Sequence, residues 1–133
     1  MGTHRARQFQ SVYEAGVVHI YANFSIGATG APTLNKTKCI GIKSIVRNGT
    51  GDYTITYGDS VQLEIDKYKR VMFFEGIVMN STASAVVQVI PLADNASSGT
   101  QRFVCSSATA TAADPENGSS LLLHIVLKNS DVV

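Results

Sequence analysis

The sequence has few charged residues and little net charge. Of its 133 residues 16% are charged, against roughly a quarter in an average soluble domain. The net charge of +1 argues against a protein that binds nucleic acid through a basic surface. Disordered chains combine low hydrophobicity with high net charge, whereas this chain is 44% hydrophobic with a mean hydropathy of +0.09. We therefore expect one folded domain spanning residues 1–133.

Long hydrophobic runs are also missing. A membrane-spanning helix needs about 20 consecutive apolar residues, and the longest apolar run here is the interrupted segment Leu121–Leu127. The residues after Met1 contain arginines but neither an apolar core nor a small-residue cleavage site, so we expect no signal peptide. The composition thus predicts no nucleic acid and no membrane among the partners of this protein.

The sequence lacks the motifs of common catalytic and metal sites. It has no nucleophile elbow, no phosphate-binding P-loop and no HExxH metal helix. The histidines His4, His19 and His124 lack the spacing of metal ligands, and we expect them to be structural. The carboxylates fall mostly at expected turns, where they bond their own backbone. We expect no catalytic residue, cofactor or metal; a carboxylate cluster assembled by the fold would be the alternative.

Two cysteines, Cys39 and Cys105, belong to no CxxC motif and to no Cys/His cluster. We expect free thiols, and a disulfide is the alternative. Six of the seven asparagines begin an N-x-Ser/Thr triplet, the acceptor pattern of N-glycosylation. Asn, Ser and Thr also crowd into turns, and we prefer this second explanation because no signal peptide is expected.

The abundant residues are those of β-strands. Val, Ile and Thr make up 35 of the 133 residues, in short runs separated by Gly, Asn, Ser and Pro. The pattern predicts an all-β fold, a single antiparallel β-sandwich that is jelly-roll-like, with about eight strands and little helix. The expected strands are 17–24, 40–47, 53–57, 61–65, 71–79, 85–92, 101–106 and 121–128.

Alternation assigns faces to some of these strands. In the run 17–24 one face carries Val18, Ile20, Ala22 and Phe24, and the other carries Val17, His19, Tyr21 and Asn23, which predicts a half-buried strand. The segment 47–52 contains an Asn-Gly pair and a second glycine, which predicts a tight hairpin. In the run 71–79 both faces are apolar apart from Glu75, and we expect a bulge at Glu75–Gly76.

Three further segments bear on contacts with other molecules. The run 121–127 is apolar on both faces, which predicts a central strand or a subunit contact. Residues 106–120 are small, polar and turn-rich, as in a long exposed loop. The first residues, about 1–10, are polar and predict an extended N-terminal arm.

Residues 42–57 read IKSIVRNGTGDYTITY, and residues 71–79 read VMFFEGIVM. This sequence resembles a pattern of small virion proteins from tailed bacteriophages, in which a strand ending in V-R-x-x-T-G turns into Y-T-I-T and an apolar strand follows. The resemblance covers about 40 residues. With the size, the neutral charge and the β character, it points to capsid decoration, or cement, proteins, which form dimers or trimers of jelly-roll-like sandwiches and have no catalytic residues.

The resemblance implies a non-enzymatic structural virion protein. Such a protein would decorate and stabilise the outer surface of a bacteriophage capsid by bridging major capsid subunits, after synthesis in the host cytoplasm. We expect a homo-oligomer, a trimer or dimer. The alternative is a phage tail or fibre component with a receptor- or glycan-binding surface. The candidate self-association residues are Val71, Phe73, Ile77, Leu121, Leu123 and Ile125, and the candidate capsid contacts are Arg5, Arg7, Phe9, Asp114 and Glu116.

Overall fold

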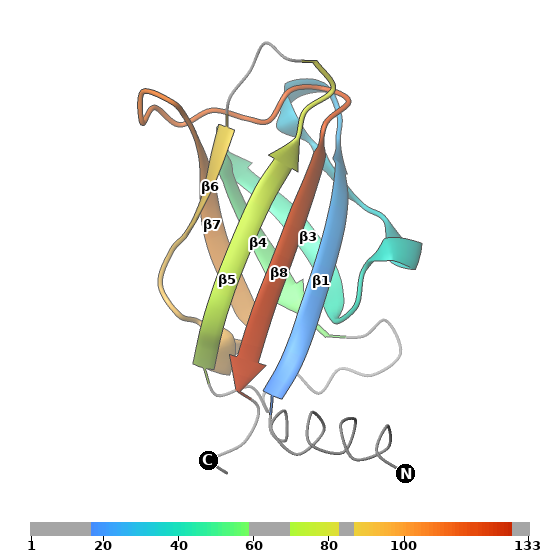
Figure 1. The fold of residues 1–133 in the computed structure, drawn as a ribbon, viewed down its shortest axis with the longest axis vertical. Coiled ribbons are helices and arrows are strands. Elements are labelled where there is room, and N and C mark those ends of the chain that lie inside the picture. The colour runs from blue at the N-terminus through green and yellow to red at the C-terminus, as the bar shows by residue number, and fades with distance from the viewer. Residues whose placement is uncertain (1–16, 59–69, 83–86, 129–133) are drawn as a thin grey trace, which may run out of the picture.

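The computed structural model describes residues 17–58, 70–82 and 87–128. These ranges contain eight strands and three one-turn 3-10 helices (Figure 1). The strands are β1 (Val17–Ile26), β2 (Pro32–Leu34), β3 (Ile42–Gly49), β4 (Asp52–Tyr57), β5 (Arg70–Met79), β6 (Val87–Pro91), β7 (Thr100–Ser107) and β8 (Ser120–Lys128). The 3-10 helices are η1 (Ala28–Gly30), η2 (Lys36–Lys38) and η3 (Ala96–Ser98). Within the described ranges, every helix is too short to cross a membrane.

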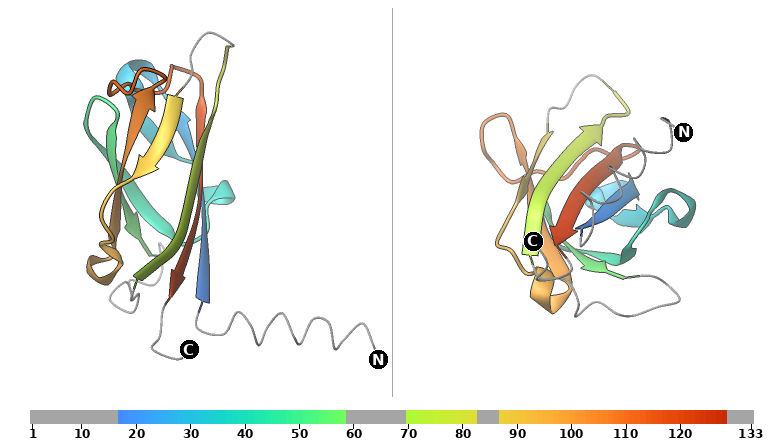
Figure 2. Two further views of the ribbon diagram at one scale, coloured as in Figure 1. Left: turned by 60° about the vertical axis from the view of Figure 1, so that its left-hand side comes forward. Right: turned by 60° about the horizontal axis from the view of Figure 1, so that its bottom comes forward.

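The strands form two four-stranded antiparallel sheets that face each other (Figure 2). Sheet A has the order β2-β1-β8-β5, and sheet B has the order β3-β4-β7-β6. The predicted all-β antiparallel sandwich of eight strands is confirmed. Its jelly-roll connectivity stays a prediction.

Seven of the expected strands correspond to strands of the structure, with ends that differ by at most two residues. The eighth, 61–65, lies outside the described residues, as does the expected N-terminal arm. Strand β2 was not expected, because it is three residues long and contains Pro32. It pairs with β1 alone at the edge of sheet A, where a proline without an N–H is tolerated.

The inward faces of both sheets meet in one hydrophobic core. On β1 the residues Ile20, Ala22 and Phe24 are buried, as alternation predicts. From sheet B, Tyr53 stacks on Phe103 with ring centroids 5.5 Å apart. Each strand thus turns alternate residues into the shared core, and the residues between them face outward.

Strand β8 lies between β1 and β5, so the predicted central strand is confirmed. The structure corrects the candidate self-association set on this strand. Leu121, Leu123 and Ile125 are 0%, 3% and 0% exposed because they face the core, so they cannot contact another copy of the folded chain. The outward-facing residues of the same strand are Leu122, His124 and Val126.

The expected bulge at Glu75–Gly76 is wrong. The register of β5 on β8 shifts between Val71 and Phe73 instead, and Glu75 faces outward by regular alternation. Gly76 faces the interior, where a Cβ atom would lie 2.6 Å from Val89 Cγ1 and 2.8 Å from Leu123 Cδ2. The glycine therefore allows close packing rather than a bulge.

The predicted hairpin between β3 and β4 is confirmed. Gly49 pairs with Asp52, which leaves Thr50 and Gly51 as the turn. Gly51 supplies the positive φ, +66°, and its missing Cβ leaves room for the Cys105 carbonyl and the Ala113 backbone. The turn is thereby packed against residues far along the chain.

Candidate interaction surface

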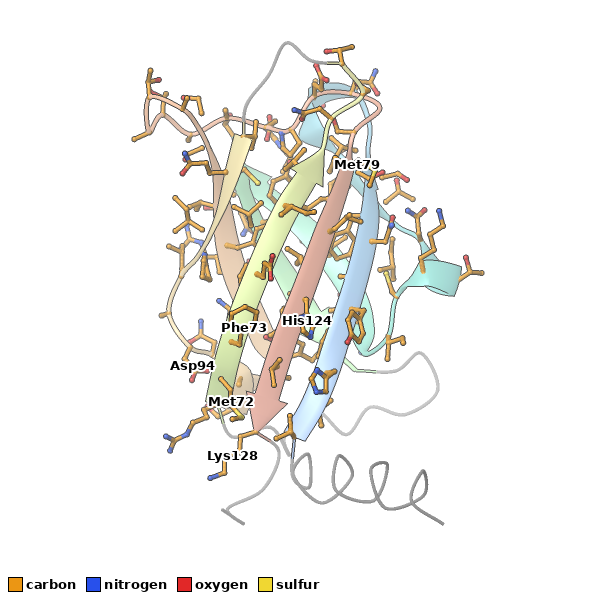
Figure 3. All side chains as sticks on the ribbon, in the orientation of Figure 1. Met72, Phe73, Met79, Asp94, His124 and Lys128 are labelled. Atoms are coloured by element: carbon orange, nitrogen blue, oxygen red, sulfur yellow. The ribbon has the colours of Figure 1, made fainter. Side chains whose placement is uncertain are left out.

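The outer side of sheet A is built by alternate residues of β1, β8 and β5, which lie side by side at the front of Figure 1. On β5 the register shift exposes the consecutive residues Met72 and Phe73. Cross-strand pairing aligns its residues in rows. We call this surface the sheet A outer face; it consists of His19, Tyr21, Met72, Phe73, Glu75, Ile77, Met79, Leu122, His124 and Val126. Figure 3 labels Phe73 on β5 and His124 on β8.

Large apolar side chains on this face are open to solvent. Phe73 is 49% exposed, Ile77 52%, Met79 59% and Tyr21 45%. Contiguous exposed apolar surface marks an interaction site more often than scattered apolar residues do. Of the candidate self-association residues, Phe73 and Ile77 lie here, whereas Val71 packs against the core.

The outer face of sheet B has a different character. Between its strands Asp52 accepts a hydrogen bond from Arg102 Nε at 2.9 Å, and this ion pair holds the pKa of Asp52 below its ordinary value, chiefly through the Arg102 hydrogen bond. Thr54 and Thr56 alternate with the buried residues of β4. The exposed large apolar residues on the strands of sheet B are Val46 and Ile90, fewer than on sheet A, so sheet A offers the more apolar of the two faces.

Aromatic rings cluster in the middle of the sheet A outer face. Tyr21 lies across from His124 in the β1–β8 register, and the two rings stack in parallel with centroids 4.7 Å apart. Phe73 meets His124 edge-on at 6.0 Å. His19 Nδ1 lies 3.2 Å from His124 Nε2.

This histidine pair was missed by sequence reasoning. The two residues are 105 positions apart, and the local sequence does not show that β1 pairs with β8. Alternation put His19 on the face of its strand opposite Ile20 and Phe24, and it put His124 on the face opposite Leu121 and Leu123, which are buried. The missing information was which strands are neighbours.

A shallow depression of about 350 Å³ lies beside the ring cluster. Its lining includes Tyr21, Glu75, Asn23 and Lys38. The segment that carries Lys38 is held against β1, because Asn35 Nδ2 donates to Asn23 Oδ1 at 2.6 Å. A flat ring beside hydrogen-bonding groups can hold a small polar molecule.

Asp114, a candidate capsid contact, has a structural role in the chain. Its carboxylate accepts hydrogen bonds from Arg47 at 3.1 and 2.7 Å, from the Gly51 N–H at 2.7 Å and from the Tyr53 hydroxyl at 3.3 Å. Partial burial acts to raise the pKa of Asp114, but the hydrogen bonds from Arg47 and Gly51 outweigh it, so the pKa lies below its ordinary value. The pKa of Tyr53 is raised, mainly by burial and then by the Asp114 charge.

Glu116, another candidate capsid contact, also binds within the chain. Its carboxylate accepts hydrogen bonds from the Thr82 N–H at 2.8 Å and from the Ser81 hydroxyl at 3.1 Å. These contacts lower the pKa of Glu116, with the Thr82 backbone making the largest contribution. The expected long loop is present between β7 and β8, but Asp114 and Glu116 fasten it to the sandwich. The other capsid candidates, Arg5, Arg7 and Phe9, lie outside the described residues.

Both cysteines are free thiols, as expected. Burial, and then the nearby Asp114 charge, raise the pKa of Cys105 to about 12. Among residues 17–58, 70–82 and 87–128, no group of three or more His, Cys, Asp or Glu side chains has the arrangement of a metal site.

Comparisons of the chain with models of protein families, with curated protein sequences and with solved structures found no match. The chemistry of the sheet A outer face and the sequence pattern of residues 42–57 and 71–79 therefore bear on function.

Proposed function

We propose that this protein is a non-enzymatic structural component of a tailed-bacteriophage virion that decorates the capsid exterior and bridges major capsid subunits. The single observation that carries the proposal is the sheet A outer face, where Phe73, Ile77 and Met79 are about half exposed. The resemblance of residues 42–57 and 71–79 to small virion proteins supplies the phage setting. In this proposal the function is mechanical: buried surface adds association free energy to each junction of the shell.

The exposed side chains set how much free energy of association this face can contribute. Full burial of a Phe, Ile or Met side chain contributes roughly 1.5–3 kcal/mol. Because Phe73, Met72, Ile77 and Met79 are about half buried already, covering them contributes about 1 kcal/mol each. The sum of about 4 kcal/mol corresponds to roughly a thousandfold in association constant. Self-association through this face, as a dimer or trimer, is the first step we propose.

One charge on this face sets a requirement for the partner. Glu75 lies directly across from His124 in the centre of the apolar surface. An unpaired carboxylate is costly to bury, so the facing molecule must bring a cation or a hydrogen-bond donor to this point. A partner that lacks such a group would leave the carboxylate unpaired and would bind less tightly.

The test compares substitutions on the two sheets. Ile77→Asp puts a charge on the sheet A outer face, and Val46→Asp puts the same charge on a residue of sheet B that is 56% exposed. We expect light scattering with EDTA present to show an oligomer for the unmodified chain and for Val46→Asp, and a monomer for Ile77→Asp. A monomeric unmodified chain would overturn the self-association step. Absence of the chain from particles purified from its source would overturn decoration.

The depression beside Tyr21 favours a second candidate function, glycan binding by a tail or fibre component. Sugar rings stack their C–H faces on aromatic side chains while hydroxyls bond to carboxylates and amides, and Tyr21, Glu75 and Asn23 provide these groups. A glycan array distinguishes the two candidates. Saturable binding that is lost in Tyr21→Ala would support the second candidate, and an array without binding would leave the first.

A further inference from the structure

We propose that His19 and His124 together bind one divalent transition-metal ion of the kind that imidazole prefers, such as Zn²⁺, Ni²⁺ or Cu²⁺. The site goes beyond the proposed function and does not depend on it. The fold creates it by placing β1 next to β8, which brings the two histidines together from 105 residues apart.

The distance between the two nitrogens fits a chelated ion. Metal–imidazole bonds are about 2.0–2.1 Å long, so two ligand nitrogens on one ion lie about 2.9 Å apart at a right angle and about 3.4 Å apart at the tetrahedral angle. His19 Nδ1 and His124 Nε2 are joined by a hydrogen bond of 3.2 Å, a separation inside this range. Backbone movement is therefore not needed to bring both nitrogens to one ion.

The rings must turn only modestly. Their planes differ by 12° and their centroids are 5.4 Å apart, so the rings meet edge to edge with the two nitrogens between the centroids. Without the ion, one of these nitrogens donates its hydrogen to the other. Once that histidine carries its hydrogen on the far nitrogen, rotating each ring by about 35° would turn both lone pairs towards a common point at tetrahedral geometry. In the bound state the hydrogens reside on His19 Nε2 and His124 Nδ1, so a neutral pair changes tautomer without losing a proton.

Neighbouring side chains hold and support the ligand His124. Tyr21 stacks on its ring at 4.7 Å and Phe73 contacts it edge-on. Glu75 lies across from His124 in the register and lines the same depression. A carboxylate commonly accepts the second N–H of a metal-bound histidine, which is the role we assign to Glu75 as a positioning residue. Because both histidines are partly exposed, solvent reaches the ion and water completes its coordination.

The experiment is a calorimetric titration of the untagged 133-residue chain with ZnCl₂ and with NiCl₂. His4→Ala serves as the background, because His4 is the third histidine of the chain. We expect one ion per chain in this background, loss of that binding in His19→Gln and in His124→Gln, and about tenfold or more weakening in Glu75→Gln. Val46→Asp, on the other sheet, should bind as the background does.

A spectroscopic readout separates ligation from a structural effect of the substitutions. In the unsubstituted chain, added Zn²⁺ should shift the ¹⁵N resonances of His19 Nδ1 and His124 Nε2, and should leave those of His4 unchanged. This measurement decides the question even if a histidine variant fails to fold. Titrations without saturable binding, binding that survives both glutamine substitutions, or unshifted nitrogens would each overturn the site. The light-scattering test of self-association is done with EDTA present, so its outcome does not depend on metal binding.

Discussion

Replacing Asp114 by alanine removes the carboxylate that fastens the β7–β8 loop to the β3–β4 hairpin. Two donors lose their acceptor, the Arg47 guanidinium and the Gly51 N–H, and the Tyr53 hydroxyl loses its longer contact. Tyr53 keeps a hydrogen bond to the Gly30 carbonyl at 2.8 Å, and Arg47 is open enough to regain water. The Gly51 N–H has the largest loss, because it gives up a 2.7 Å bond to a charged oxygen.

The expected loss of stability follows from this ranking. A hydrogen bond to a charged group contributes roughly 1.5–3 kcal/mol, so we expect Asp114→Ala to lower the free energy of unfolding by about 2–3 kcal/mol. For a chain of 133 residues, an unfolding entropy of about 2.1 cal/mol/K per residue converts this loss to a fall in Tm of about 7–11 °C.

Urea unfolding followed by circular dichroism measures the difference. The chain has no tryptophan, so far-UV signal is preferable to fluorescence. Glu75→Ala, which removes an exposed carboxylate from the sheet A outer face, is the matched control and should change stability by less than about 0.5 kcal/mol. Equal losses in the two variants would refute the assigned role of Asp114.

The effect also has a defined pH dependence. Because the folded pKa of Asp114 lies below its ordinary value of 3.8, its contribution is present well above that pH and is lost as the pH falls through the folded pKa. The stability curves of the unmodified chain and Asp114→Ala should therefore converge in acid. A gap that stays constant down to the lowest pH at which both chains fold would contradict the charge-based explanation.

Two other predictions concern the core. Gly76→Ala places a methyl group within 2.6 Å of Val89 Cγ1 and should lower the free energy of unfolding, measured in urea, by about 1–3 kcal/mol. Gly49→Ala, with open space at its Cβ position, should change the free energy of unfolding little. Equal effects of the two substitutions would contradict the packing argument. Raising the pKa of Cys105 from 9.0 to about 12 lowers its thiolate fraction about a thousandfold, so DTNB should label Cys39 first in the native protein. Mass spectrometry after partial labelling identifies which cysteine reacts first. Cys39→Ser should leave a single thiol that reacts slowly with DTNB. Early modification of Cys105 would show that the strand pairing around it opens.

Much of the fold could be predicted because strand signals are local. Runs of Val, Ile and Thr located seven strands of the structure, and alternation identified Ile20 and Phe24 as buried. The short edge strand β2 could not be found, since three residues that include a proline carry little strand signal. The bulge on β5 was placed at the wrong position, because Gly76 serves packing against Val89 and not a change of register.

The candidate site was predicted less completely. Phe73 and Ile77 lie on the sheet A outer face, but Leu121, Leu123 and Ile125 do not. Where both faces of a strand are apolar, alternation says which residues share a face and cannot say which face is covered. That choice depends on which sheet lies opposite, which is a property of the whole chain.

Composition and the alternation of neighbouring residues were enough to predict the fold class and the positions of most strands, because both signals are local. The tertiary structure decided which strands pair. Pairing of β1 with β8 brought His19 to His124, and closure of the β7–β8 loop brought Asp114 to Arg47, 67 residues away. Such contacts depend on the packing of two complete sheets around one core, and no local pattern encodes the distance between residues so far apart.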